Sequence, residues 1–334
     1  MSEIKVAWYG TNGHQISWSV AKAERAKVVG VADCTEEQFA EYQKEMPEAY
    51  SAAKLYPSLD ELLEKSGAEL ISICSARRDE QHLHIKQALE AGMHVYAEKP
   101  LATTMDGLET IRAAVESSGR QLRSMTGMPY SPIFSAMKEH VDDGRLGTVV
   151  QVFAQKSYPY RDSRPQDRGV DGGLIEQASI HAVSFVRYVT GLEFEEIYGL
   201  DTGVGNPKEG DLQMGSTYVA RMSSGALCTI DANYCNPTGF ATWGNDQLRV
   251  HGTGGMIEAV DGLKRTMVAL GDAEPGEIEF ESVKGDGADR LFVAFVDHLL
   301  DGKEMLVSQD DSFMNTRVVI RAQESATSGE IVKV

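Results

Sequence analysis

The chain has 334 residues, and its 32 lysines and arginines against 50 aspartates and glutamates give a formal net charge of −18. At about 150 residues per domain, this length predicts two domains, each large enough to bury its own core. A strongly acidic protein repels phosphate backbones and anionic membrane surfaces, so neither nucleic acid nor membrane is an expected partner.

The sequence shows no targeting or metal-binding signal. No apolar run approaches the roughly 18 to 20 residues that span a bilayer, and the N-terminal MSEIKVAWYG does not read as a signal peptide. Cys34, Cys74, Cys228 and Cys235 lack ligand spacing and are expected to be reduced thiols. We therefore expect a cytoplasmic protein without a metal site.

The first 125 residues alternate strand and helix patterns. The predicted strands are Ile4–Tyr9, Lys27–Ala32, Leu70–Cys74 and Met93–Ala97, and predicted helices between them include Glu36–Met46 and Gln81–Ala91. Strands separated by helical stretches indicate βαβ units, which favour an open, doubly wound parallel sheet. Residues 1–125 are thus predicted to form a nucleotide-binding domain of α/β class.

Residues 126–334 have a different order of predicted elements, with several strands in succession and helices before and after them. The predicted strands are Val149–Gln155, Ser216–Met222, Ala226–Asn233 and Gln247–His251; the predicted helices are Pro132–Asp142, Leu174–Tyr188, Leu291–Leu300 and Asp311–Ser325. This order predicts an α+β domain built on a mostly antiparallel sheet.

A glycine-containing loop follows the first predicted strand. Gly10, Thr11, Asn12, Gly13 and His14 are expected to open a helix there, where backbone N–H groups could receive a pyrophosphate. The match to G-x-G-x-x-G is poor, because only the first glycine is in place. An ordinary strand-to-helix turn is the alternative interpretation.

Asp33 ends the second predicted strand, where a carboxylate can bind the hydroxyls of an adenosine ribose. An ordinary turn aspartate is the alternative. The residues after it, Cys34-Thr35-Glu36-Glu37, include no cation to receive a 2′-phosphate. NAD is therefore the predicted cofactor, and NADP is less favoured.

The most specific segment is Ala91-Gly-Met-His-Val-Tyr-Ala-Glu-Lys-Pro100, preceded by His84. With Gly172-Gly173 and His181 further on, it resembles the family of glucose–fructose oxidoreductase, inositol dehydrogenase and rhizopine-catabolism proteins (Gfo/Idh/MocA). The resemblance covers essentially the whole chain. It implies a Rossmann domain and a second domain with an open sheet, and a homodimer or homotetramer formed through that sheet.

The resemblance implies a cofactor site that adds Ser75, His84, Glu98, Lys99 and Pro100 to the loop and Asp33. Pro100 disfavours the helical conformation at Lys99, so this lysine is expected to extend toward the reacting hydroxyl. An exposed loop lysine is the alternative. His84 is expected to shape the loop rather than to catalyse; His82 and His84 lie about 200° apart on a helix and share no metal.

His181 is the candidate general base, since an imidazole pKa near 6.5 suits proton transfer at neutrality. In the family an acid four residues earlier shares its helix face, but this position is Gln177, which cannot take a proton. Glu176 lies about 140° round a regular helix and is a poor substitute unless the helix is irregular. A buried structural histidine is the alternative reading for His181.

The loop from Tyr158 to Gly173 contains Arg161, Arg164 and Arg168, an unusual concentration of cations in an acidic chain. These side chains and Tyr158 are predicted to contact a polyhydroxylated ring, or a carboxylate or phosphate. Ion pairs within the protein or between subunits are equally compatible. Asn233-Tyr234 and Thr242-Trp243 are further candidate lining residues.

The resulting functional hypothesis is an NAD-dependent dehydrogenase acting on a secondary hydroxyl of a sugar, sugar derivative or cyclic polyol. His181 would remove the hydroxyl proton, Lys99 would stabilise the developing alkoxide, and Gln177 would orient the substrate. Two alternatives stay open. One is a non-catalytic regulator that binds nucleotide and sugar, and the other is a glycosidase or lyase that recycles its NAD.

Overall fold

The computed structural model describes residues 2–240, 243–281 and 287–334, which divide into two compact units. Unit 1 comprises Met1–Gly127, Gly169–Asp171 and Gly285–Met314, and unit 2 comprises Met128–Arg168, Gly172–Lys284 and Asn315–Val334. Nowhere in the described ranges is a helix both long and apolar enough to cross a bilayer.

The two units differ from the predicted division into 1–125 and 126–334, because two later segments return to unit 1. One is held by polar contacts, since the Asn12 side chain donates to the Val170 carbonyl at 2.8 Å. The other is held by aromatic packing, since the Tyr96 ring lies 5.3 Å from Phe292 and 6.1 Å from Phe295. The local sequence pattern does not indicate that either segment belongs to unit 1.

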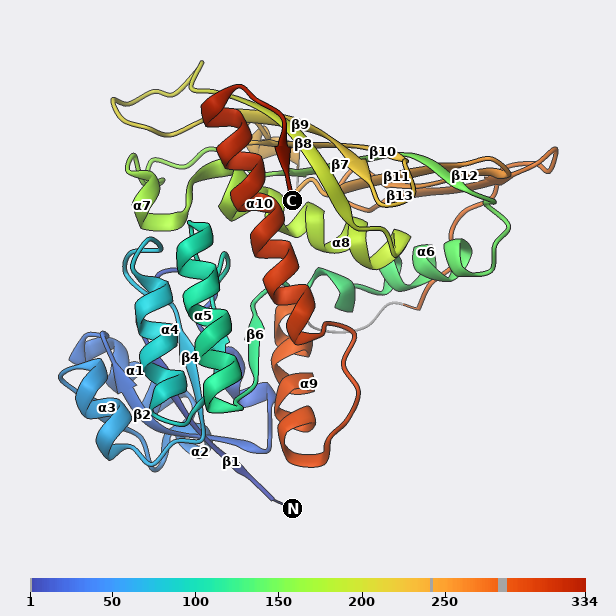
Figure 1. The fold of residues 1–334 in the computed structure, drawn as a ribbon. Coiled ribbons are helices and arrows are strands. Elements are labelled where there is room, and N and C mark those ends of the chain that lie inside the picture. Colours follow the sequence, from blue (N-terminus) through green and yellow to red (C-terminus); the bar gives the residue numbers. More distant parts are fainter. Residues whose placement is uncertain (1, 241–242, 282–286) are drawn as a thin grey trace. The chain divides into compact units, whose positions relative to one another are not determined.

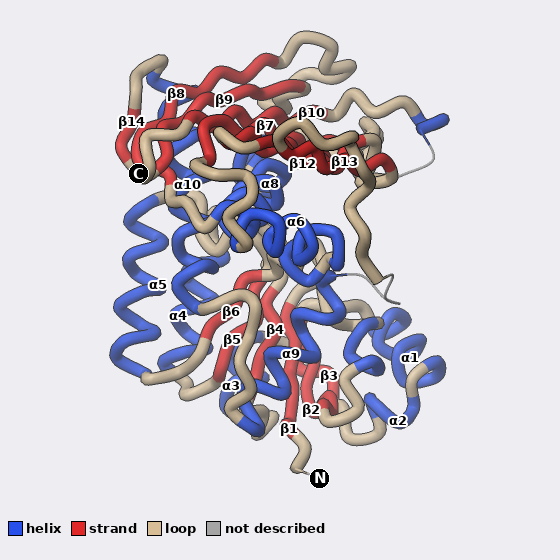
Figure 2. Tube along the Cα trace, turned by 90° about the vertical axis from the view of Figure 1, so that its right-hand side faces the viewer, coloured by secondary structure: helices blue, strands red, loops and turns tan. Residues whose placement is uncertain are grey.

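Unit 1 is built on a fully parallel six-stranded sheet (Figures 1 and 2). In spatial order its strands are β3 (Lys54–Tyr56), β2 (Ala26–Ala32), β1 (Ile4–Tyr9), β4 (Leu70–Ile73), β5 (His94–Ala97) and β6 (Leu122–Ser124). The order 3-2-1-4-5-6 is that of the Rossmann fold, whose ligands bind at the carboxyl edge where the order reverses. Here the reversal lies between β1 and β4.

Helices complete unit 1. They are η1 (Ser19–Lys22), α1 (Glu36–Glu45), α2 (Pro47–Tyr50), α3 (Leu59–Lys65), α4 (Gln81–Glu90), α5 (Met105–Ser118) and α9 (Gly287–Asp301). Thr35 begins α1 with a capping box, in which its hydroxyl accepts from the Gln38 N–H while the Gln38 side chain accepts from the Thr35 N–H. The short α7 (Arg168–Asp171) ends in this unit, and α10 (Gln309–Ser328) begins in it and continues in unit 2.

Unit 2 is built on an eight-stranded sheet. In spatial order its strands are β13 (Arg265–Leu270), β12 (Gly255–Val260), β11 (Gln247–Gly252), β7 (Val149–Ser157), β10 (Leu227–Asn233), β9 (Gly215–Met222), β8 (Phe194–Thr202) and β14 (Val332–Lys333). All neighbouring pairs are antiparallel except β7 with β10. The predicted fold class, a doubly wound parallel sheet plus a mostly antiparallel sheet, is confirmed.

One face of this sheet is covered by helices and the other is open. The remaining helical elements are η2 (Met128–Tyr130), α6 (Pro132–Asp142), η3 (Ile175–Ser179), α8 (Ile180–Thr190) and η4 (Thr238–Phe240). In both views α6 and α8 lie along the same face of the strands (Figures 1 and 2). Along β9, buried and exposed residues alternate, which is the pattern of a sheet with one buried face.

The helix that contains His181 is irregular at its start. η3 is a π turn, with α8 following directly. Within the turn the Ser179 hydroxyl donates to the Ile175 carbonyl at 2.5 Å, and Tyr218 of β9 donates to the same hydroxyl at 3.1 Å. A serine side chain that bonds to the carbonyl four residues back competes with the regular α-helical hydrogen bond. The helical stretch predicted over about Leu174–Tyr188 is therefore present, but it begins with a π turn instead of an α-helical turn.

Stacked aromatic rings lie in the core beneath the unit 2 sheet. Phe134 of α6 and Phe185 of α8 are both fully buried, with ring centroids 4.6 Å apart. We expect Phe134→Ala to lower the free energy of unfolding by about 3–5 kcal/mol, through lost burial and the cavity left behind. Urea unfolding followed by circular dichroism measures this change.

The matched control is Phe280→Ala, which removes the same side chain from a position 44% exposed. This variant should change the free energy of unfolding by no more than about 0.5 kcal/mol. Equal transition midpoints for the two variants would show that the Phe134–Phe185 stack does not support the core.

Candidate functional site

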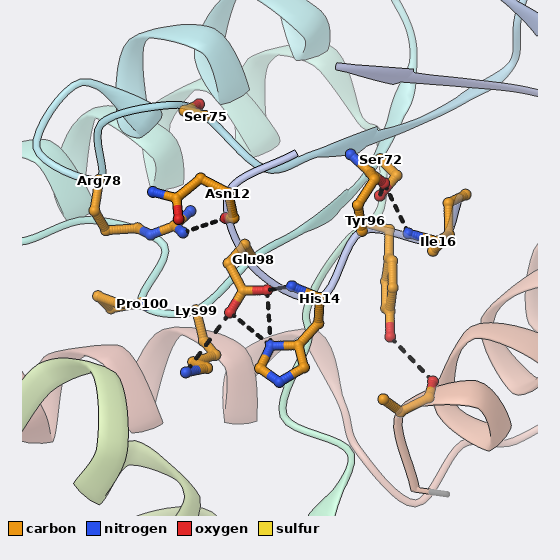
Figure 3. A network of polar contacts seen from close by, with 12 residues as sticks. Asn12, His14, Ile16, Ser72, Ser75, Arg78, Tyr96, Glu98, Lys99 and Pro100 are labelled. Atoms are coloured by element: carbon orange, nitrogen blue, oxygen red, sulfur yellow. Dashed lines mark hydrogen bonds and ion pairs between the residues drawn. The ribbon is translucent and has the colours of Figure 1, made fainter. Parts of the chain in front are cut away.

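The carboxyl edge of the parallel sheet gathers most of the predicted cofactor residues of unit 1 (Figure 3). The loop after β1 meets the segments that follow β4 and β5. Gly10 has φ +75°, and a Cβ there would lie 2.1 Å from the Cys74 carbonyl oxygen. Only glycine fits this position, because both the backbone angle and the neighbouring strand exclude a side chain.

The carboxylate of Glu98 is contacted by several residues of this edge, and the residue is only 1% exposed. Its carboxylate accepts the His14 N–H at 2.5 Å and lies 3.0 Å from the His14 Nδ1 (Figure 3). Burial raises the pKa of Glu98, but His14, Lys99 and Arg78 outweigh burial, so the pKa lies well below its usual range. Glu98 is therefore a buried anion rather than a proton donor.

Lys99 follows at once and is 3% exposed, and its Nζ lies 3.7 Å from the Glu98 carboxylate. The peptide bond to Pro100 is cis. A nearly fully buried ammonium has to be compensated by a neighbouring anion. The Glu98–Lys99 pair thus places a cation at the sheet edge, where ligands of this fold bind.

Gln81 and Arg78, which sequence reasoning missed, hold the loops of this edge together. The Gln81 amide donates to the carbonyls of Glu98 at 2.7 Å and Pro100 at 3.0 Å, and its oxygen accepts from Arg78. Arg78 also donates to the Asn12 carbonyl at 2.8 Å. No local sequence signal marks them, because their role follows from burial and from partners on other segments.

Ser75 and His84 form a pair in which the Ser75 hydroxyl lies 2.8 Å from His84 Nδ1. The Tyr9 ring packs edge-on against the imidazole at 5.0 Å. Burial lowers the pKa of His84, with Glu80 and Asp33 opposing. His84 is tied into the sheet edge in the way expected of a residue that shapes the loop.

Asp33 ends β2 in the left-handed region with φ +57°. Together with Thr11, Thr35, Gln38 and Tyr56 it lines a hollow of about 660 Å³. Aspartate is among the few non-glycine residues that adopt this conformation readily. Its carboxyl group therefore borders a space in which an adenosine could lie.

The helix expected after Gly13 is not present. Turns follow instead, and the next helical element is the 3₁₀ helix η1 at Ser19–Lys22. The Gln15 side chain donates to the Tyr9 and Gly10 carbonyls at 3.2 and 2.8 Å, and the His14 N–H is taken by Glu98. Side chains thus fix the conformation of this loop. A pyrophosphate bound here would not meet the N-terminus of a regular helix.

These residues fit a dinucleotide in the adenosine half. The hollow beside Asp33, with Thr11 on its wall, would accept the adenosine. Lys99 would serve the nicotinamide half.

The candidate substrate residues of unit 2 start with His181, which is 7% exposed in α8. Gln177 donates to the Tyr234 hydroxyl at 2.9 Å, and Glu176 is 1% exposed. Because a π turn has i→i+5 hydrogen bonds, residues five apart come close to one face within it. Glu176 belongs to this turn and His181 to the α-helix that follows, so the separation of about 140° in a regular helix does not apply to this pair.

Two of the three loop arginines stack on aromatic rings. The Arg164 guanidinium lies 4.3 Å from the Tyr234 ring centroid and 5.5 Å from that of Tyr158, and Arg161 lies 4.0 Å from Trp243. Tyr158 and Trp243 have centroids 5.5 Å apart. We call these five side chains the arginine–aromatic cluster.

A buried ion pair borders this cluster. Lys156 Nζ lies 2.6 Å from Asp246 and 5.1 Å from the Tyr158 ring centroid. Burial lowers the pKa of Lys156, but Tyr158 and Asp246 outweigh burial, so that the pKa is raised. The sequence analysis did not identify either residue, because nothing in the local sequence distinguishes this lysine from other lysines near the end of a strand.

One sequence candidate, Arg168, is not part of the cluster. Arg168 is exposed at the start of α7, with its stem against Gly173, where a Cβ would meet Arg168 Cγ at 2.6 Å. Thr242 lies outside the described residues. The structure thus joins Tyr158, Arg161 and Arg164 with Gln177 through Tyr234, and Arg168 is not among the cluster's stacking partners.

Gly13 has φ +126°, and a Cβ at this position would lie 2.6 Å from the Glu98 carboxyl carbon. We expect Gly13→Ala to displace Glu98 and to weaken NADH binding at least about tenfold, measured by the quenching of protein fluorescence. Gly67→Ala is the control, since Gly67 has φ +63° and open space around its Cβ position. It should lose about 1–2 kcal/mol of stability and bind NADH normally; equal NADH affinities would contradict the role of Gly13.

Comparison with known proteins agrees with these features. Residues 5–126 match the model of the oxidoreductase family with an NAD-binding Rossmann fold, and residues 134–258 match the GFO/IDH/MocA C-terminal domain. The myo-inositol 2-dehydrogenase of Thermotoga maritima is 28% identical over 267 residues, covering 77% of this chain and 73% of that protein. The NAD⁺-dependent scyllo-inositol 2-dehydrogenase of Bacillus subtilis is 24% identical, covering 80% and 78%.

A solved structure from Thermotoga maritima superimposes with a TM-score of 0.87 and 26% identity, covering 99% of this chain and 100% of that one. The two family models match residues in both units, and the model matched by residues 5–126 is that of an NAD-binding Rossmann fold. The chain belongs to the Gfo/Idh/MocA oxidoreductase family and carries its NAD-binding Rossmann domain.

Proposed function

We propose that the protein is an NAD-dependent dehydrogenase that acts on a secondary hydroxyl of a sugar, a sugar derivative or a cyclic polyol. The observation that carries the proposal is the buried Glu98–Lys99 pair at the carboxyl edge of an NAD-binding sheet. Support comes from two relatives that are inositol dehydrogenases. NAD bound at this edge supplies a hydride acceptor.

The proposed roles follow from the chemistry of each side chain. Lys99 donates a hydrogen bond to the reacting oxygen and stabilises the alkoxide as its proton leaves. His181 takes that proton, because a neutral imidazole is a competent base near neutrality. Gln177 orients the substrate, and its amide is itself fixed by Tyr234. Glu176 supplies a buried carboxylate on the same π turn.

The decisive activity assay follows absorbance at 340 nm with NAD⁺ or NADP⁺ and a panel of inositols, aldoses, amino sugars and glycosides. We expect NADH to form with at least one of them, and NAD⁺ to be preferred because Asp33 is followed by no cation. His181→Asn should then lower kcat about 10²–10⁴-fold and leave NADH affinity near normal. Lys99→Met should lower kcat to a similar extent.

His140→Asn, the same change at a histidine of α6 that is partly exposed, is the control and should keep full activity. Tight NADH binding with silence across the panel would favour a regulator. Cleavage of a glycoside without accumulation of NADH would identify a recycling glycosidase or lyase instead.

We also propose a homo-oligomer formed through the open face of the unit 2 sheet. Phe153, Tyr198, Leu200, Val219 and Leu227 are 38–55% exposed and lie on neighbouring strands. A contiguous apolar patch of this kind on a sheet is typical of an interface. Its burial against a second copy would remove these side chains from water.

Leu227→Glu places a charge within this patch and should convert the oligomer to monomers in size-exclusion chromatography with light scattering. Val204→Glu is the control, because Val204 is 83% exposed in the loop after β8 and should leave the mass unchanged. A monomeric wild-type protein would refute the proposal.

We also propose a cytoplasmic location, which is supported by the free thiols of Cys34, Cys74, Cys228 and Cys235.

A further inference from the structure

The arginine–aromatic cluster holds a cation whose hydrogen-bonding edge has no protein acceptor among the described residues. The Arg164 guanidinium packs against the rings of Tyr234 and Tyr158, and no ion pair or side-chain hydrogen bond is formed by it within those ranges. Stacking occupies the faces of a guanidinium and leaves its N–H groups in the ring plane. Arg164 is thus oriented by aromatic rings and keeps its donors for another group.

Two carboxylates of this region are engaged by lysines. Asp246 is taken by Lys156 at 2.6 Å, and Lys208 lies 3.8 Å from the Asp162 carboxylate. Arg161 is likewise stacked, on Trp243, and forms no ion pair in the part of the chain that the structure describes. The two guanidinium groups of the cluster thus carry positive charge without a paired carboxylate among the described residues, in a chain of net charge −18.

The cluster is connected to the candidate substrate residues. Tyr234 is 1% exposed, its ring carries Arg164 and its hydroxyl accepts from Gln177. Gln177 belongs to the π turn that leads directly into His181. The Tyr234 side chain thus contacts both the guanidinium and the amide expected to orient the substrate.

We propose that Arg164, supported by Arg161, binds an anionic group of the substrate, so that the substrate class is an acidic sugar or polyol derivative. This inference rests on the proposed function for the reacting hydroxyl. Guanidinium groups bind carboxylates and phosphates in the same bidentate manner. A sugar acid and a sugar phosphate share this chemistry, and the two sources are separated by experiment.

The test is calorimetric titration of the full-length protein saturated with NADH, using matched ligands. Glucose is compared with glucuronate and glucose 6-phosphate, and myo-inositol with myo-inositol 1-phosphate. Wild-type protein should bind at least one anion about tenfold or more tightly than its neutral counterpart, as expected for hydrogen bonds to a charged group. A preference within the carboxylate or the phosphate arm identifies the source of the charge.

Arg164→Gln should remove most of this preference, and Arg164→Lys should retain part of it, because a lysine keeps the charge without the bidentate fork. Arg145→Gln is the control, since Arg145 is exposed and paired with Asp143 elsewhere in unit 2. It should keep the full anion preference.

Equal affinity of wild-type protein for every anion and its neutral partner would overturn the inference, whether or not any variant folds. An anion preference that survives in a folded Arg164→Gln variant would overturn it as well. Failure of the proposed function is a separate result: anions would then bind in the calorimeter while no ligand yields NADH. Oxidation of neutral sugars without any anion preference would instead support the dehydrogenase proposal and contradict the proposal of anion binding.

Discussion

The nucleotide unit depends on one buried charge, the Glu98 carboxylate. A carboxylate that is 1% exposed is tolerated only if hydrogen bonds and cations replace the water it has lost. His14 supplies both its backbone N–H and its ring, and Lys99 adds a positive charge. These contacts fix the loop after β1 against the segment after β5, and so set where a cofactor's phosphates and its nicotinamide can lie.

Most of the fold could be predicted because its patterns are local. The strand at Ile4–Tyr9 and the helix at Pro132–Asp142 were predicted with the observed bounds, since hydrophobic periodicity and flanking glycines or prolines mark them. The helix predicted after Gly13 is wrong, because side-chain contacts of Gln15 and Glu98 replace the helical hydrogen bonds there. The His14–Glu98 contact joins residues 84 positions apart, which no local pattern reveals.

The candidate site shows the same division. Positions such as Asp33, Glu98 and Lys99 follow strands and can be found by counting along the chain. Gln81 and Lys156 could not, because their importance comes from burial and from partners on other segments. The π turn at Ile175–Ser179 is of this second kind, since it is stabilised by a hydroxyl reaching from β9. Because of this turn, the separation that a regular helix would give Glu176 and His181 does not apply to them.

The single parallel pair in the second sheet has a consequence for how the chain folds. β8, β9 and β10 pair as sequence neighbours and can form early, as can β11, β12 and β13. β7 lies between the two groups, where Val152 pairs with both Cys228 and Val250, so it must wait for segments far along the chain. Such non-local pairing is slow, because the entropy of loop closure is lost before contacts are gained. The arginine-bearing loop follows β7 directly, and its aromatic partners therefore come together only as the sheet closes, in the last and slowest phase of folding.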